Sequence, residues 1–239
     1  MKKTVLILSL FLLFPWFSKS QGNMETMLQE IQKITWKTPK DSLQKIISFM
    51  NSHPINDYQY YYWNAYAHYM DYFNYKLSNP SEEKKAEQCL EHATKLLGKI
   101  NQTNSEVVAL QSLIDGLKLN FTNVFLLPIK AGKVGKLAER AIELNPQNPR
   151  AYYALAIYDY YTPKIYGGRK RVEANLTKAI HLFQNPLIHT KEPQWGFSES
   201  YLYLIRFLKE ENQKSKAQQY LQEAKTKFPE NTSFQHFKL

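Results

Sequence analysis

The residues best suited to chemistry in this 239-residue chain are six histidines and one cysteine, and they are dispersed along it. His68 lies three residues before Asp71, and Cys89 three before His92, so each pair would share a helix face and could bind a metal ion or form a nucleophile pair. Two ligands do not complete a metal site, and we favour the simpler interpretation of ordinary surface polar neighbours for the first pair and a half-buried thiol for the second. The sequence also has no Walker-type phosphate loop, no Gly-x-Ser-x-Gly elbow and no His-Glu-x-x-His helix. We therefore expect no catalytic residue, no metal and no cofactor.

A glycine turn followed by three cations precedes an expected helix at Gly167, Gly168, Arg169, Lys170 and Arg171. Backbone N–H groups at a helix start attract anions, so Gly167, Gly168 and Arg169 are candidates for an anion site. The alternative is that the glycines supply positive φ in an enlarged turn while the cations face water. Cations at a helix N-terminus oppose the helix dipole unless an anion is bound there.

The densest aromatic stretch runs from Tyr58 to Phe73. If Trp63 takes the first packing position of a helix, the helical period predicts which side chains share its inner face. These are Tyr61, Asn64, His68, Asp71 and Tyr72, and the same register in a later helix gives Arg150, Tyr153, Ile157, Tyr160 and Tyr161. A concave wall of tyrosines with a few polar groups suits a peptide or a small ligand. Alternatively, these residues only pack against a neighbouring helix.

Helices must position these residues, because apolar residues recur with a 3.6-residue period, glycine is scarce and prolines fall between periodic segments. The pattern predicts helices over residues 24–34, 42–50, 58–75, 82–97, 105–119, 134–144, 150–160, 172–183, 197–208 and 215–228. Alternating strand patterns are absent over any useful length. The chain is therefore expected to be all-α.

An internal repeat accounts for the layout of these helices. Four segments superpose on the alanines Ala93, Ala141, Ala179 and Ala224, and seven residues before them stand Ala86, Val134, Val172 and Ala217. Small residues at such positions let stacked helix pairs approach closely. Residues 138–153, with an alanine, an Asn-Pro stop and an aromatic opening the next helix, resemble the junction between two tetratricopeptide repeats. The alanines lie 48, 38 and 45 residues apart, against about 34 in that repeat, so the loops must be enlarged.

Two of the enlarged loops resemble those of exported, functionally uncharacterised repeat proteins of the Bacteroidetes type. They are Pro163 to Gly168 and Pro193 to Gly196, and the resemblance extends over roughly Tyr58 to Leu208. It implies a right-handed superhelical array of tetratricopeptide-repeat-like antiparallel helix pairs in an exported protein. It implies no catalytic residue.

The first twenty residues have the pattern of a secretory signal peptide, with Lys2 and Lys3, an apolar run over residues 4–17 and a small-x-small ending at Ser20. The apolar run is shorter than a membrane span needs, so we expect residues 21–239 to form one exported repeat domain, periplasmic or secreted, without a membrane span. Cleavage would lower the net charge from +10 to +7. The scattered basic residues predict no nucleic-acid binding, and a single cysteine allows no internal disulfide bond.

These observations predict a non-enzymatic repeat protein that binds a protein or peptide along its concave face. One alternative is an accessory subunit that binds a small solute for a periplasmic transport system, which a closed pocket and a group such as Arg150 would favour. A second alternative is an enzyme with an unrecognised site, which would require several converging ionisable residues with displaced pKa values.

Overall fold

The computed structural model describes residues 38–239 apart from 79, 102, 186–192 and 194, together with 26, 27, 29–31 and 34. The expected signal peptide and most of the expected helix over residues 24–34 lie outside these described residues. Within them the chain is helical and contains no strand, so the prediction of an all-α fold is confirmed.

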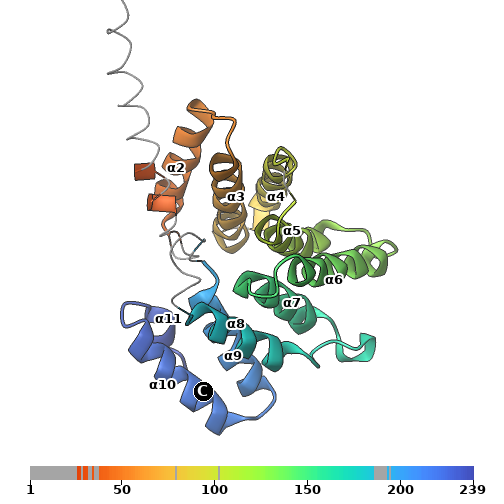
Figure 1. Ribbon diagram of the computed structural model, residues 1–239, viewed down its shortest axis with the longest axis vertical. Coiled ribbons are helices and arrows are strands. Elements are labelled where there is room, and N and C mark those ends of the chain that lie inside the picture. The colour runs from red at the N-terminus through yellow and green to blue at the C-terminus, as the bar shows by residue number, and fades with distance from the viewer. Residues whose placement is uncertain are drawn as a thin grey trace, which may run out of the picture.

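The helices pack in antiparallel neighbouring pairs, as the repeat pattern predicts (Figure 1). They are α2 (Lys40–Ser52), α3 (Tyr58–Ser78), α4 (Glu83–Leu97), α5 (Ser105–Lys118), α6 (Leu127–Leu144), α7 (Pro149–Tyr161), α8 (Val172–Phe183), α9 (Phe197–Glu210), α10 (Lys214–Lys227) and α11 (Thr232–Gln235), with short 3-10 turns at Pro80–Glu82, Leu119–Phe121 and Lys164–Tyr166. The pairs are α3 with α4, α5 with α6, α7 with α8, and α9 with α10. They follow a curved path, so that α2 and α10 end on the same side of the molecule (Figure 1).

The small residues of the repeat sit at the closest helix contacts. All four repeat alanines are fully buried, and so are Ala86, Val172 and Ala217 at the earlier position, while Val134 is nearly so. A side chain no larger than these permits the second helix of each pair to press against its neighbours, since helix axes approach only as closely as the intervening side chains allow. The spacing of small residues therefore located the pair interfaces correctly.

Asparagine side chains cap the starts of α5 and α7, the helices that carry Glu106 and Arg150. The Asn104 side chain accepts a hydrogen bond from Val107 N (3.0 Å) at the start of α5, and Asn148 accepts one from Arg150 N (2.8 Å) at the start of α7. Each cap satisfies a backbone donor that has no partner within the helix.

Helix α6 is longer than predicted, because it begins at Leu127 rather than at residue 134. Pro128 occupies the first turn, where a proline starts a helix readily. The periodic pattern missed these two turns because their apolar side chains face solvent instead of the core, as Leu127 and Ile129 do. Surface exposure of apolar residues removes the contrast on which a periodicity argument depends.

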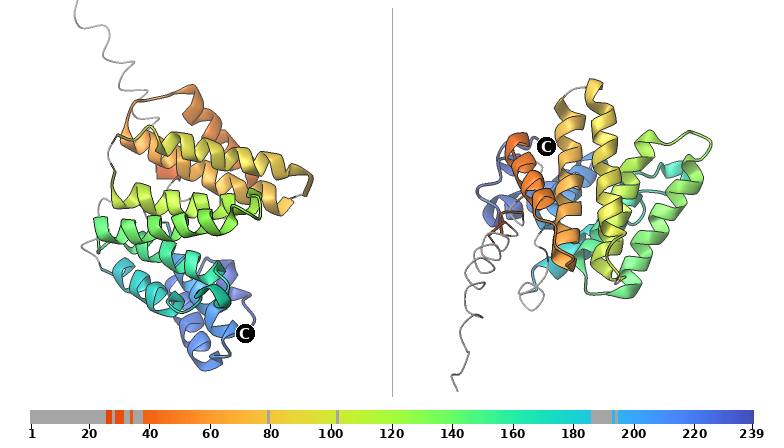
Figure 2. Two further views of the ribbon diagram at one scale, coloured as in Figure 1. Left: turned by 90° about the vertical axis from the view of Figure 1, so that its right-hand side faces the viewer. Right: turned by 90° about the horizontal axis from the view of Figure 1, so that it is seen from above.

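The turns within the pairs gather at one end of the array. Because α3, α5 and α7 run in one direction and α4, α6 and α8 in the other, the α3–α4, α5–α6 and α7–α8 turns lie on the same side (Figure 2). The connections between pairs, over residues 98–104 and 145–148, lie at the opposite end (Figure 2). We call the first side the turn end of the array.

Gly168 and Gly132 make a matched pair for testing the packing of the α7–α8 turn. A Cβ on Gly168 would stand 2.0 Å from the Thr162 carbonyl oxygen, whereas a Cβ on Gly132 in α6 would meet nothing within 4 Å. We expect Gly168→Ala to lower the free energy of unfolding by about 1–3 kcal/mol, and Gly132→Ala to raise it by about 0.5–1 kcal/mol. Urea unfolding measures both. Equal effects of the two substitutions would contradict the packing of this turn.

Candidate functional site

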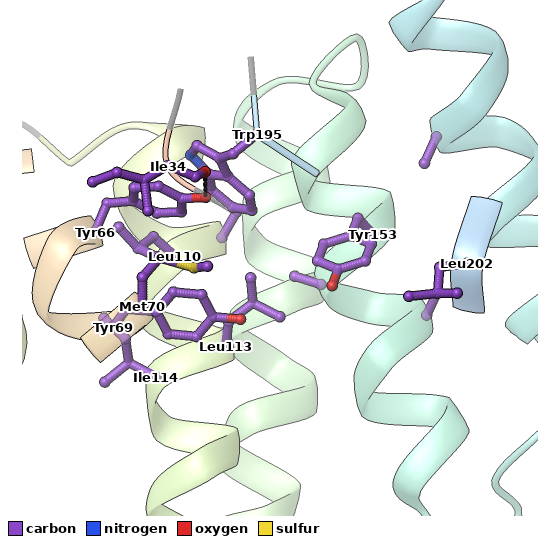
Figure 3. Packing of buried hydrophobic residues seen from close by; sticks show 14 of the residues in the cluster. Ile34, Tyr66, Tyr69, Met70, Leu110, Leu113, Ile114, Tyr153, Trp195 and Leu202 are labelled. Carbon is purple, nitrogen blue, oxygen red and sulfur yellow. Dashed lines mark hydrogen bonds between the residues drawn. The ribbon is translucent and has the colours of Figure 1, made fainter. Parts of the chain in front are cut away.

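The centre of the array's inner side is filled by Trp195, which precedes α9 (Figure 3). Its ring stacks on Tyr66 of α3 with centroids 5.3 Å apart and meets the edge of Tyr153 of α7 at 6.4 Å. Its indole N–H donates a hydrogen bond to the Tyr62 hydroxyl (3.0 Å). The chain itself therefore occupies the middle of the wall that the sequence predicted to be a concave binding face.

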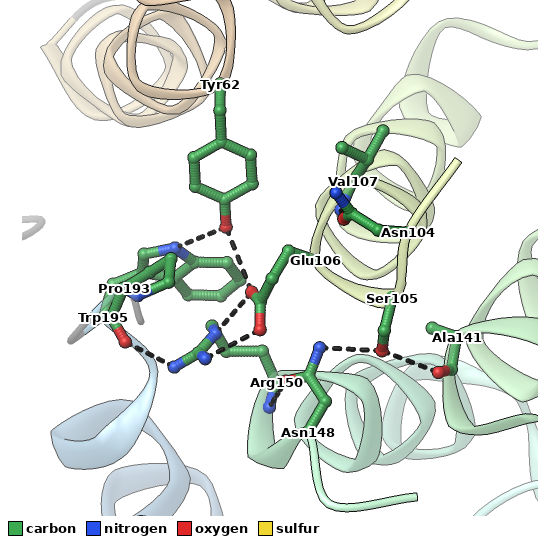
Figure 4. Close-up of polar contacts among 10 residues, drawn as sticks. All are labelled: Tyr62, Asn104, Ser105, Glu106, Val107, Ala141, Asn148, Arg150, Pro193 and Trp195. Atoms are coloured by element: carbon green, nitrogen blue, oxygen red, sulfur yellow. Dashed lines mark hydrogen bonds and ion pairs between the residues drawn. The ribbon is translucent and has the colours of Figure 1, made fainter. Parts of the chain in front are cut away.

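A buried ion pair lies beside Trp195 and holds its segment in place (Figure 4). Arg150 donates from Nε to Glu106 Oε2 (2.6 Å) and from Nη2 to Glu106 Oε1 (2.7 Å), which is the bidentate geometry that arginine and carboxylate prefer. Its remaining Nη1 donates to the Pro193 carbonyl oxygen (2.5 Å). Tyr62 donates to Glu106 Oε2 (3.3 Å), and burial, then the Glu106 charge, raises the pKa of this phenol well above its usual value.

The register of Arg150 and Glu106 is set by a second group of hydrogen bonds between α5, α6 and α7 (Figure 4). Asn148 donates to the Ser105 hydroxyl (2.8 Å), which donates in turn to the Ala141 carbonyl oxygen (2.7 Å). The residues before Arg150 and Glu106 are thereby fixed to each other and to the end of α6. Arg150, predicted as a ligand contact, is 1% exposed and has a structural partner at both ends of its guanidinium.

Removing one member of this ion pair should be far more costly than removing both. Arg150→Met leaves the Glu106 carboxylate, whose side chain is 13% exposed, without its cation, so we expect a loss of about 3–5 kcal/mol in the free energy of unfolding. The double variant Arg150→Met, Glu106→Leu should recover about half of that loss or more, because no buried charge remains. Urea unfolding of the three proteins measures the difference. A loss below about 1 kcal/mol in the single variant would contradict this account.

The α3 residues predicted to face a ligand lie among neighbouring helices. Of Tyr61, Asn64, His68, Asp71 and Tyr72, all but the half-buried Tyr61 are buried. The Asn64 amide donates to Asn51 Oδ1 of α2 (3.3 Å), and the Tyr72 hydroxyl accepts from Asn120 after α5 (3.3 Å). Helix α3 packs between α2, α4 and Trp195, so these contacts favour a packing role over direct contact with a ligand.

His68, Asp71, Cys89 and His92 meet across the interface of α3 and α4. The His68 and His92 rings lie 5.2 Å apart, and the Cys89 thiol donates to Asp71 Oδ2 (3.7 Å). Burial, followed by the charge of Asp71, raises the pKa of Cys89 to about 12, so the thiol stays protonated and is a poor nucleophile. No three His, Cys, Asp or Glu side chains in the described part of the chain are grouped closely enough to hold a metal ion.

Because of His68, the free energy of unfolding should depend on pH. Burial, then the charge of His92, lowers its pKa from 6.5 to about 4 in the folded protein. Because the unfolded chain binds this proton more tightly, the contribution of neutral His68 is complete above about pH 6.5 and is lost as the pH falls towards 4. The shift corresponds to a loss on the order of 3 kcal/mol. The neighbouring Asp71 acts in the opposite direction, since burial raises its pKa.

Comparison of variants isolates the histidine contribution. We expect His68→Leu to unfold in urea with a smaller loss of stability between pH 7 and about pH 4.5 than the wild-type protein shows. His236→Leu is the control, because His236 is exposed near the C-terminus. If wild type and His68→Leu lose the same free energy over this pH range, His68 is not neutral in the folded state.

The three predicted tyrosines of α7, Tyr153, Tyr160 and Tyr161, form a group with tyrosines of α3 and α9. The Tyr161 and Tyr203 hydroxyls are hydrogen-bonded at 3.1 Å, and the Tyr203 ring contacts Tyr153 at 6.2 Å and Tyr160 at 5.4 Å. Burial raises the pKa of Tyr203, and the nearby hydroxyls of Tyr161 and Tyr69 raise it further. Tyr161 is 66% exposed although its hydroxyl is held in this group. We call these five residues the tyrosine rim.

The α7–α8 turn, a candidate anion site from the sequence, is held by carboxylates of the chain. Arg169 pairs with Glu210 (2.7 Å) and Glu211 (3.0 Å) at the end of α9. The Asp159 carboxylate accepts from Arg171 N (2.7 Å) at the start of α8, and its backbone carbonyl accepts from Arg169 N (2.8 Å). The helix dipole, Arg169 and Arg171 thus have negative partners within the protein, and the turn has a structural role that needs no bound anion.

The backbone of this turn requires glycine at positions 167 and 168, for a different reason at each. Gly167 has φ of 86°, which an L-residue rarely adopts, and Gly168 lies against the Thr162 carbonyl group. The sequence left open that both glycines supply positive φ while the cations face water, but only Gly167 of the two has positive φ, and Arg169, with φ of 68°, is paired with carboxylates.

Sequence reasoning did not single out Trp195, Glu106 or Tyr203 as members of this region. A tryptophan in a loop directly before a glycine and a helix start is a usable signal, because a large aromatic residue in a loop generally packs against something. Gly196 has φ of 99° and turns the chain into α9, which aims Trp195 inward. The described helices include none long and apolar enough to span a membrane.

No protein-family model and no curated protein matches this sequence. Among solved structures, the chain is similar to the HusA haemophore from Porphyromonas gingivalis, with a TM-score of 0.57 and 20% identity over 80% of this chain and 93% of that one. YrrB, described as a TPR protein with an unusual peptide-binding site, aligns with a TM-score of 0.40 and 14% identity over 82% of this chain and 83% of that one. At such identity the likeness to the haemophore concerns the fold alone, a curved array of helix pairs.

Proposed function

We propose that this protein is an exported, non-enzymatic binding protein that holds a small, flat, largely apolar ligand at the tyrosine rim. One observation carries the proposal: Tyr161 presents 66% of its surface to solvent while its hydroxyl is fixed by Tyr203 at 3.1 Å. An exposed ring held in one orientation is preorganised for stacking on a ligand, so little side-chain freedom is lost on binding. Export rests on the signal-peptide pattern of residues 1–20.

The filled centre of the inner side favours a small ligand. A long peptide lying along the whole concave face would have to displace Trp195 from its stack on Tyr66 and break the Arg150 contact to Pro193. The stacking on Tyr66, the hydrogen bond of Trp195 to Tyr62 and the hydrogen bond of Arg150 to Pro193 would then be lost together. The tyrosine rim between α7 and α9 stays accessible without such a rearrangement.

Haem is the first ligand to test, because the similar structure is a haemophore. Haem is a flat apolar ring with carboxylates at one edge and an iron that accepts a tyrosine ligand in some proteins. The rim offers matching groups: the Tyr161 ring and hydroxyl, and the exposed Arg206, whose guanidinium lies 5.7 Å from the Tyr203 ring centre. An arginine at that position is suited to pair with a carboxylate.

A protein or peptide partner is the second candidate function. Exposed tyrosine backed by partly buried aromatic residues is typical of the residues that dominate protein interfaces, and Tyr161 with Tyr160 and Tyr203 has this character. A partner that inserts a single side chain at the rim would avoid Trp195. Either ligand is compatible with an accessory subunit of an uptake system.

Hemin titration of residues 21–239 tests the first candidate. We expect a saturable change in the Soret absorption band with the wild-type protein. Tyr161→Phe should weaken binding about tenfold, which corresponds to about 1.4 kcal/mol. Tyr152→Phe is the matched control, because Tyr152 lies on the same helix but faces Lys178 of α8.

The outcomes separate the two candidates. Equal binding by wild type and both variants would exclude the tyrosine rim as the haem site, and no Soret change at all would exclude haem. A protein captured from the envelope fraction by the wild type and lost with Tyr161→Ala, in the absence of haem binding, would favour the second candidate.

A further inference from the structure

Large apolar side chains are exposed mainly at the turn end of the array. The α5–α6 turn and the start of α6 expose Val124 (69%), Phe125 (85%), Leu126 (48%), Leu127 (37%) and Ile129 (62%). Exposed apolar residues in a contiguous group indicate an interaction surface, whereas single ones are ordinary.

The neighbouring α7–α8 turn extends the same feature. Ile165 is 84% exposed and Tyr166 77%, and both turns lie on one side of the molecule (Figure 2). Within the described residues, Ile55 is the one exposed large apolar side chain outside these two turns and the adjoining ends of their helices. The exposure is therefore concentrated at one end of the protein.

The α5–α6 turn is an ordered projection. Asn123 accepts hydrogen bonds from Phe125 N at its side chain (2.9 Å) and from Leu126 N and Leu127 N at its backbone carbonyl (3.0 and 3.1 Å). The following Lys130 N donates to the Leu126 carbonyl oxygen (3.0 Å), so the segment is continuous with α6. The backbone N–H groups of Phe125, Leu126 and Leu127 are thus satisfied within the turn while their side chains are exposed.

Lysines flank this apolar tip along the chain. Residues 116–138 contain Lys118, Lys130, Lys133 and Lys136 and no acidic residue. Lys130 and Lys133 are exposed on the first turns of α6, next to Ile129. The nearest acid in sequence, Asp115, is partly buried and accepts a hydrogen bond from Gln111 (2.7 Å). The surface thus combines a protruding apolar tip with exposed lysines on the first turns of α6.

We propose that the α5–α6 turn docks the protein on an anionic membrane surface, with Phe125 and its neighbours inserted at the headgroup boundary and the lysines facing lipid phosphates. Apolar side chains flanked by lysine are the combination that binds such interfaces. The tip protrudes and has no groove of its own, so it matches a deformable surface. A second copy fits poorly, because a symmetric tip-to-tip contact would bring the same lysines of both chains together.

Vesicle sedimentation of residues 21–239 tests this proposal. We expect binding to vesicles of phosphatidylcholine with phosphatidylglycerol and little binding to phosphatidylcholine alone. Phe125→Ser, or Lys130→Glu with Lys133→Glu, should weaken binding to the anionic vesicles about tenfold. Ile55→Ser and Lys95→Glu with Lys178→Glu are the matched controls, since these residues are also exposed but lie away from the α5–α6 turn, and they should leave binding within about twofold of wild type.

A fluorescent probe distinguishes insertion from simple charge attraction. An environment-sensitive dye on Phe125→Cys labels selectively, because the other cysteine, Cys89, is buried. We expect its emission to shift to the blue with anionic vesicles and not with free inorganic phosphate. Equal binding by wild type and tip variants, no binding to either vesicle, or a dimer that Phe125→Ser abolishes would each overturn the proposal.

Discussion

The inner side of this protein depends on the buried pair of Arg150 and Glu106. Three helices and one loop converge on it: α5 supplies the carboxylate, α7 the guanidinium, α3 the Tyr62 hydroxyl and the 193–196 segment the Pro193 carbonyl oxygen. A buried ion pair adds little net stability, but it strongly penalises any arrangement that separates its members. The pair therefore specifies one position for Trp195, and that position decides which part of the inner side remains open.

Because Trp195 fills the centre of the array, less of the inner side is open to a ligand. Helical arrays commonly present a continuous concave groove, whereas here Trp195 covers part of the inner side and, within the tyrosine rim, Tyr161 stays exposed. Burial raises the pKa values of Tyr153 and Tyr203 above their usual value, so these hydroxyls stay neutral even in alkaline solution and can both donate and accept hydrogen bonds. Neutral tyrosines with exposed aromatic surface, next to the Arg206 guanidinium, suit a flat apolar ligand that carries an acidic edge.

The helices were largely predictable from the sequence because local rules decide them. The helix over residues 172–183 was located to the residue, and the asparagines before α5 and α7 start their helices as caps do. The beginning of α6 could not be predicted from hydrophobic periodicity, because its apolar side chains are exposed to solvent instead of facing the core. The candidate site was harder to predict from the sequence, because the contact of Trp195 with Tyr62 joins residues 133 positions apart. Only the folded array brings such groups together.

The indole N–H resonance of Trp195 offers the most direct test of this account. In the nuclear magnetic resonance spectrum of residues 21–239, Trp195→Phe identifies the signal. Zinc protoporphyrin, a diamagnetic analogue of haem, is then added, because paramagnetic ferric iron would also broaden signals of residues that do not touch the ligand. The account predicts that signals of Tyr161, Tyr203 and Arg206 respond while the Trp195 indole signal stays in place, because its hydrogen bond to Tyr62 persists. A Trp195 signal that shifts or is lost with the same saturation as the others would show that the ligand enters the centre of the array, and would contradict the account.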